Sequence, residues 1–108
     1  MLCSASDSDF DSVRVLRQRA NRMQRRGEFR KAVLALREAA ALDSSGASYV
    51  RLAHGLLLVE RRDEALHAFK QALYCFRHDH QRGRARTVAE LILKLDPADR
   101  NARRKAAA

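Results

Sequence analysis

Histidines are the side chains in this sequence best suited to metal or acid–base chemistry. His78 and His80 lie two residues apart in the segment HDH, a spacing that brings two imidazoles near one metal ion. Neighbouring histidines in a turn are far more often solvated. His54 and His67 fall on different predicted helices, and neither has an evident carboxylate partner. The histidines therefore predict neither a metal site nor a general base.

Other signatures of enzymes are also missing from the sequence. The four glycines are too scattered to form a loop that cradles a phosphate group, and neither a paired-cysteine zinc spacing nor a His-Glu-x-x-His motif occurs. We therefore expect a protein that is not an enzyme and that needs no cofactor and no metal.

The charge of the chain predicts acidic partners. The sequence has 22 Lys and Arg against 13 Asp and Glu, a formal net charge of +9, and 18 of the basic residues are Arg. Three of the acidic residues precede position 12, so the rest of the chain is more basic still. Such a surface attracts acidic proteins or nucleic acid. An Arg-biased genome or an ordinary solvated surface explains the same composition, and both interpretations stay open.

The compartment is predicted from what the sequence lacks. No apolar run approaches the roughly 20 residues of a membrane span, and the first ten residues lack the regions of a signal peptide. We therefore expect a cytoplasmic protein that does not enter a membrane. Cys75 falls on an apolar helix face and Cys3 in a polar segment, which favours a reduced, buried Cys75 over a disulfide.

The elements that position these side chains are predicted to be six α-helices in one domain. Ala, Leu, Arg, Gln, Glu and Lys dominate the composition and are good helix formers. Apolar residues with a 3.6-residue period predict helices that begin after Ser12 and after Gly27, and a third that follows the turn at 43–48 and runs to about Val59. A fourth is predicted to begin near Arg62, and further helices are predicted over about 82–95 and 98–106. Residues 1–11 are small, polar and acidic, and we expect them to form a disordered tail, with Asp11 or Ser12 as the first N-cap.

The apolar pattern of the second predicted helix returns 33 residues later. The matching pairs are Ala32 and Ala65, Leu36 and Phe69, and Ala39 and Ala72. Small residues allow helices to approach closely, and large residues fill the grooves between them. Repetition of such positions at a fixed interval is typical of stacked helix hairpins, each of which buries its apolar face on its neighbour.

This pattern resembles the tetratricopeptide repeat, a helix–turn–helix unit of 34 residues. The first repeat has the family's series of small, Gly, aromatic, Ala, large and Ala residues, at Ala20, Gly27, Phe29, Ala32, Leu36 and Ala39. The second repeat matches at Ala53, Ala65, Phe69 and Ala72, but Glu60 and Arg62 replace the turn Gly and the aromatic residue. The third repeat is atypical: Val88 and Ala89 echo Leu52 and Ala53, and LDPADRNA resembles the junction between repeats.

The resemblance implies an all-α fold, a right-handed stack of antiparallel helix hairpins over residues 12–107. The repeats are expected at about 13–45, 46–78 and 82–107. In this family the first helices of the hairpins line a concave groove that binds a peptide or a helix of another protein. Carried over to this sequence, the groove is expected to present Arg14, Arg17, Asn21, Arg25, Val50, Arg51, His54, Leu57 and Arg86. The implied function is a non-catalytic adaptor or chaperone that binds an acidic or amphipathic segment of another protein.

A sharper hypothesis concerns a partner's C-terminal carboxylate. Family members that bind one carry a basic residue and an Asn four residues apart on the first helix, and Arg17 and Asn21 occupy these places. The match weakens in the second repeat, where Arg51 stands in place of another Asn, and in the third, which offers only arginines. The alternative is that Arg17 is one solvated arginine among many.

Two rival functions remain open at this stage. The first is a sequence-nonspecific nucleic-acid-binding protein that uses Arg22, Arg25, Arg26, Arg30 and the C-terminal RNARRK segment. Because aromatic residues are few, such binding would depend on the phosphate backbone rather than on base stacking. The second is self-association, in which a homo-oligomer covers apolar surface left open by a weak last hairpin.

Overall fold

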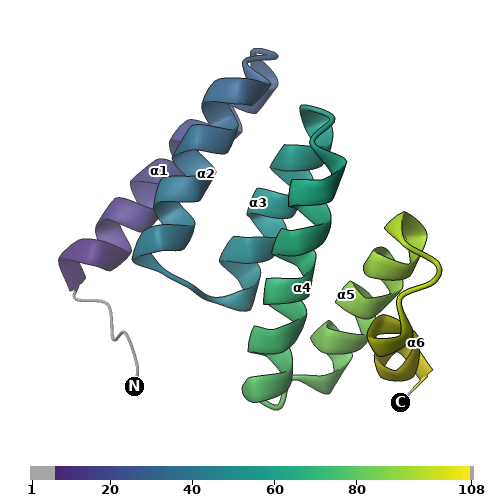
Figure 1. Cartoon of the computed structure of the whole chain (residues 1–108). Coiled ribbons are helices and arrows are strands. Elements are labelled where there is room, and N and C mark those ends of the chain that lie inside the picture. Colours follow the sequence, from purple (N-terminus) through teal and green to yellow (C-terminus); the bar gives the residue numbers. More distant parts are fainter. Residues whose placement is uncertain (1–6, 108) are drawn as a thin grey trace.

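The structure, a computed structural model, describes residues 7 to 107, and this part of the chain forms six α-helices (Figure 1). Their bounds are α1 (Asp7–Arg25), α2 (Phe29–Leu42), α3 (Gly46–Leu58), α4 (Arg62–His78), α5 (Arg82–Leu95) and α6 (Arg100–Ala107). Each helix packs mainly on its neighbours in the sequence. The prediction of an all-α stack of antiparallel hairpins is therefore confirmed, with α1/α2, α3/α4 and α5/α6 as the three pairs.

The first helix begins earlier than we expected. Residues 7–11 belong to α1 rather than to a disordered tail, so Asp11 and Ser12 lie inside the helix and do not cap it. Asp11 instead forms an ion pair with Arg14, 3.6 Å apart and one turn further on, a spacing that supports a helix. The other residues of the expected tail, 1–6, lie outside the described residues.

The alanine stripe predicted from the repeat lies where the helices pack. Its members are at most 2% exposed: Ala32, Ala39, Ala65 and Ala72. Phe69, which is 1% exposed, belongs to the same buried core. The packing of α2 on α3 is equally close, because a Cβ on Gly55 would come within 2.8 Å of Leu36 Cδ1. Close approach of the helices thus follows from small residues at fixed places.

Three turns between helices share one backbone geometry. Gly27, Glu60 and His80 have positive φ angles of 78°, 61° and 58°. In each turn the next residue donates its N–H to the carbonyl five positions earlier, as from Glu28 to Met23 at 2.8 Å and from Arg61 to Leu56 at 2.9 Å. This is the hydrogen bond that closes a helix end with a left-handed residue. The predicted role of Gly27 is confirmed, and Glu60 adopts the same conformation without being Gly.

The last helix covers the end of the stack and is capped by Asp99. The backbone N–H of Ala102 donates to Asp99 Oδ1 at 2.8 Å, and Lys70 of α4 pairs with the same carboxylate at 3.2 Å. The hydrogen bond from Ala102 first, and then Lys70, lower the pKa of Asp99. Ala102 is completely buried. This helix begins at Arg100, two residues later than the expected start near 98.

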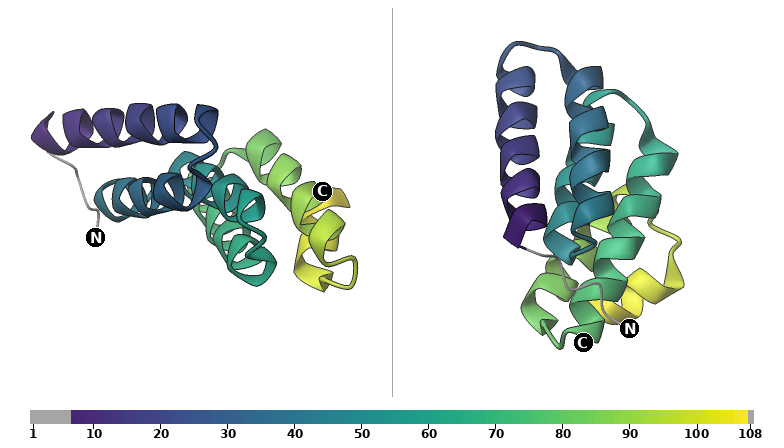
Figure 2. Two further views of the ribbon diagram at one scale, coloured as in Figure 1. Left: turned by 90° about the horizontal axis from the view of Figure 1, so that it is seen from above. Right: turned by 90° about the vertical axis from the view of Figure 1, so that its left-hand side faces the viewer.

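The stack is two helices thick. Its smallest dimension is 18 Å, close to the width of two packed helices, and the hairpins follow one another along the molecule (Figure 2). On one side the second helices are linked by ion pairs, Arg37 of α2 with Glu64 of α4 and Lys70 of α4 with Asp99 beside α6. The other side is formed by the first helices, α1, α3 and α5.

Candidate functional site

A cleft of about 530 Å³ runs between α3 and α5 on the side formed by the first helices. It is lined by Ala47, Val50, Arg51 and His54 of α3, by Phe76 of α4, and by Gly83, Arg84, Thr87, Val88 and Leu91 of α5. On each helix these residues recur at intervals of three and four, so they form one face. The antiparallel turns before and after α4 make α3 and α5 run in the same direction, and the two faces therefore meet along the cleft.

The cleft has an apolar floor and a basic rim. Phe76 and Val88 are buried, Val50 and Leu91 are half-buried, and the charged side chains above them are exposed. The guanidinium group of Arg84 lies 5.9 Å from the centre of the Phe76 ring, a distance at which the cation is attracted to the ring face. Among the described residues that line the cleft, none is Asp or Glu. An elongated ligand with apolar and acidic groups would therefore meet complementary chemistry along the whole cleft.

Two aromatic contacts fix the walls of the cleft. The imidazole of His54 meets Phe69 edge-on, with ring centroids 5.3 Å apart and an angle of 86° between the rings. A Cβ on Gly46 at the start of α3 would come within 2.5 Å of the Phe76 ring. Phe76 thus packs against α3 at a residue without a side chain, and it contributes to the floor of the cleft. This packing gives the cleft its shape before any ligand binds.

The start of α3 is further held by a polar network that includes a predicted site residue. Arg17 Nη2 donates to Ser48 Oγ at 2.7 Å and pairs with Asp43 Oδ2 at 3.2 Å. Ser48 also donates to Asp43, and its backbone N–H donates to the Oγ of Ser45, which caps α3. The Arg17 side chain is 26% exposed, and its Nε is buried without a hydrogen-bond partner. Arg17 therefore links α1 to the α2–α3 turn through a carboxylate of its own chain.

The structure brings some of the predicted site residues together and separates others. Three of them, Val50, Arg51 and His54, line the cleft. Leu57 lies half-buried one turn beyond His54 and does not line it. Arg86 points elsewhere and pairs with Glu90 at 3.7 Å. On α5 the cleft is instead lined by Arg84, Thr87 and Leu91, which our alignment of the third repeat did not place in the groove.

The predicted residues on α1 lie apart from this cleft. Asn21 and Arg25 are exposed, Arg14 is exposed and paired with Asp11, and none of the three lines the α3–α5 cleft. Arg17 and Asn21 are one turn apart, as the hypothesis of a bound C-terminal carboxylate requires. However, the guanidinium group of Arg17 already pairs with Asp43, so a partner's carboxylate would have to displace the carboxylate of Asp43.

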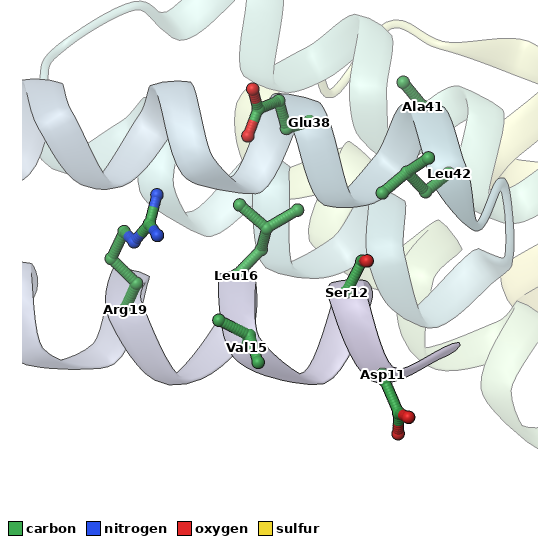
Figure 3. A pocket seen from close by; sticks show the side chains of 8 residues that line it. All are labelled: Asp11, Ser12, Val15, Leu16, Arg19, Glu38, Ala41 and Leu42. Atoms are coloured by element: carbon green, nitrogen blue, oxygen red, sulfur yellow. The ribbon is translucent and has the colours of Figure 1, made fainter. Parts of the chain in front are cut away.

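A second hollow of about 680 Å³ lies between α1 and α2 at the free end of the stack (Figure 3). Leu16 and Arg19 extend from α1 toward α2, where Glu38 and Leu42 complete the lining, and Asp11 points away. Charges of both signs line it, so it lacks the basic character of the cleft. The large apolar side chains exposed in the described part of the chain lie on α1 to α4 and not on the last hairpin, contrary to our expectation for self-association.

His78 and Cys75 are side chains with possible chemistry that lie outside the clefts. Within residues 7–107 no group of three His, Cys, Asp or Glu is placed to hold a metal ion. His78 stacks on Tyr74, with ring centroids 6.1 Å apart. Burial, and secondarily the charge of Asp79, raise the pKa of the half-buried Cys75 thiol, which makes it less reactive at neutral pH. None of the helices described is long and apolar enough to span a membrane.

Neither models of protein families nor curated protein sequences match this chain. Some solved structures, however, match the fold of this chain. The second TPR domain of the human RPAP3 protein, determined by NMR in complex with the HSP70 peptide SGPTIEEVD, superimposes with a TM-score of 0.58. The likeness covers 92% of this chain and 95% of that domain at 16% sequence identity. The six helices therefore have the fold of a tetratricopeptide-repeat domain with three repeats.

Proposed function

We propose that this tetratricopeptide-like stack is a non-catalytic protein-binding module that holds an acidic, partly apolar peptide segment in the α3–α5 cleft. The observation that carries the proposal is the cleft itself, in which Arg51 and Arg84 stand above a floor of Phe76 and Val88. An adaptor or chaperone is the cellular role that such a module would serve.

The fold likeness supports a protein partner. The RPAP3 domain is described with a peptide whose last five residues are Ile, Glu, Glu, Val and Asp, so that ligand combines apolar and acidic side chains. At 16% identity the likeness itself extends only to the fold. The case for a similar class of ligand therefore depends on the basic rim and apolar floor of the cleft in this chain.

Binding is expected to depend on two kinds of contact. An aliphatic or aromatic side chain of the peptide would cover Phe76, Val88 and Leu91, and each fully buried side chain of this kind contributes about 1.5–3 kcal/mol. A neighbouring Glu or Asp would pair with Arg51 or Arg84, whose guanidinium groups offer paired N–H donors to a carboxylate. Together these contacts select a segment in which apolar and acidic residues are close in sequence.

Recognition of a free C-terminus is not part of this proposal. Its first requirement, a basic side chain available at Arg17, conflicts with the ion pair that Arg17 makes with Asp43. Arg14, Asn21 and Arg25 lie exposed on α1, beside the cleft helix α3. The proposed contribution of the two arginines is long-range attraction of an acidic segment, which salt weakens, whereas Asn21 is neutral and contributes none. Amidation of the peptide C-terminus should therefore change its affinity little.

The proposal can be tested by selecting peptides from a displayed library on the full chain. Selected sequences should place an apolar residue close to Glu or Asp, and their affinities are then measured by fluorescence anisotropy at about 0.15 M salt. The double change Arg51→Ala with Arg84→Ala should weaken binding at least about tenfold, equivalent to ~1.4 kcal/mol. Circular dichroism checks that the variant remains folded, which is expected because both side chains are exposed.

A matched control removes the same charge elsewhere. Arg22 of α1 and Arg30 of α2 are exposed and lie outside the cleft, and no ion pair holds either of them in the described part of the chain. Arg22→Ala with Arg30→Ala should reduce affinity by less than about twofold at this salt concentration. Equal losses in the two double variants would show that only net charge matters and would overturn the proposed site.

A further inference from the structure

A third hollow, also of about 530 Å³, opens where the α4–α5 turn meets α6. It is lined by Arg77, His80, Gln81, Arg82, Ala85, Arg104 and Lys105. We call these residues the basic cleft. Four positively charged side chains thus come from three helices: Arg77 from the last turn of α4, Arg82 from the first residue of α5, and Arg104 and Lys105 from the second half of α6. The basic cleft shares no residue with the α3–α5 cleft.

The charges of the basic cleft are not neutralised by the protein. Eight other basic side chains in the described part of the chain form ion pairs with Asp or Glu, but Arg77, Arg82, Arg104 and Lys105 form none. No carboxylate lines the cleft. Partial burial, and then the charges of Arg77 and Arg104, lower the pKa of Lys105. Lys105 is therefore close enough to Arg77 and Arg104 for their charges to repel, and an anion between them would relieve this repulsion.

The N-terminus of α5 adds to this positive potential. Gln81 occupies the N-cap position of a 14-residue helix, but its side chain makes no capping hydrogen bond. The first N–H groups of a helix lack partners within the helix and carry a partial positive charge. Both Gln81 and Arg82 line the basic cleft. An anion held by the four cations would thus also lie near the positive end of the helix.

We propose that the basic cleft binds a compact anion that carries phosphate groups. Phosphate suits the donors present, because arginine guanidinium groups bind its oxygens in pairs and lysine adds a point charge. The volume lies within the range of small-ligand sites. Phe, Tyr and Trp are absent from the described residues that line the cleft, so the larger aromatic platforms on which bases stack are missing there. These features favour a small polyphosphate or phosphate ester over a nucleic-acid strand.

The test uses the full chain and three probes, inorganic phosphate, pyrophosphate and tripolyphosphate. Amide NMR spectra recorded at constant ionic strength should show shifts concentrated in residues 77–85 and 100–107, and the affinity should increase with the number of phosphate groups. Sulfate, titrated in the same way, should cause markedly smaller shifts than pyrophosphate.

Variants locate the site. Arg104→Gln with Lys105→Gln should weaken pyrophosphate binding at least about tenfold. Arg77→Gln with Arg82→Gln, on two other helices, should do the same, so the test does not depend on α6 remaining folded in the first variant. The control Arg22→Gln with Arg30→Gln removes the same charge far from the cleft and should change the affinity by less than about twofold.

Three results would each overturn this proposal. One is that pyrophosphate causes no larger shifts than sulfate, and another is that all three double variants lose affinity equally. The third is that a short single-stranded oligonucleotide binds more tightly than tripolyphosphate and shifts amides on α1 and α2 as well. None of these results bears on the peptide proposal, which concerns other residues.

Discussion

Gly46 offers the sharpest test of how the second hairpin and the α3–α5 cleft depend on one packing contact. A Cβ at this position would lie 2.5–2.7 Å from three atoms of the Phe76 ring, whereas carbon atoms pack at about 3.5–4.0 Å. The Gly46→Ala variant must therefore move the ring or the start of α3 by about 1 Å. Overpacking of this kind costs about 1–3 kcal/mol.

A gain in helix propensity opposes this cost. Replacing Gly by Ala inside a helix gains at most about 1 kcal/mol, and less at the first position, where Gly46 lies. We therefore expect Gly46→Ala to lower the free energy of unfolding by about 0.5–2 kcal/mol. Each kcal/mol corresponds to a decrease in Tm of about 4–8 °C for a domain of this size. Thermal melts followed by far-UV circular dichroism measure the difference directly.

Gly83 provides the matched control. It lies in the first turn of α5, as Gly46 does in α3, but a Cβ there would meet nothing within 4 Å. Gly83→Ala should therefore leave Tm unchanged or raise it, by an amount that corresponds to at most about 1 kcal/mol. If Gly46→Ala melts at or above the temperature of Gly83→Ala, the packing of Phe76 on α3 described here is incorrect.

Three further predictions follow from other parts of the fold. Glu60→Gly should stabilise the chain by up to about 1 kcal/mol, because a non-glycine residue at positive φ carries a steric cost; an unchanged or lower urea midpoint would contradict this. Ala39→Arg places a charge at a position that is 2% exposed and should cost at least about 3 kcal/mol, enough to unfold a marginal domain, so a cooperative melt at the native Tm would exclude close packing there. Asp99→Ala should lower stability by about 1 kcal/mol at neutral pH. The pKa of Asp99 is lowered in the fold, so the difference in free energy of unfolding between the variant and the native chain should be complete above about pH 4. This difference should vanish as the pH falls through the lowered pKa, and a difference that persists in acid would argue against the cap.

Much of the architecture could be predicted from the spacing of small residues. Ala32, Ala39, Ala65 and Ala72 recur at the interval of the repeat and are buried as expected, because only small residues permit the close approach of helices. The residue type at Glu60 gave no sign of the turn geometry, because an unfavourable residue takes the conformation that Gly27 has in the first repeat. The backbone hydrogen bonds of the turn outweigh the local preference of the side chain.

The site was harder to predict than the fold, for two physical reasons. The cleft lies between α3 and α5, so it uses the face of α5 that meets α3 and includes Arg84, whereas the prediction carried the groove face of the earlier repeats over to Arg86. The ion pair between Arg17 and Asp43 joins residues 26 positions apart across a turn, and no helical periodicity reports such a contact. Residues 84, 87, 88 and 91 have the spacing of one helix face, so this part of the cleft lining could have been predicted from the sequence.

The most direct test of the α3–α5 cleft is to map where a selected acidic peptide binds. In amide NMR titrations of the full chain, the largest shifts should fall on residues 47–54 of α3 and 84–91 of α5, around Arg51 and Arg84. Amides of α1 around Arg17 and Asn21 should shift little, whether the peptide ends in a free carboxylate or an amide. Shifts centred on α1, or binding lost on amidation, would contradict the proposed cleft and favour recognition of a C-terminal carboxylate instead.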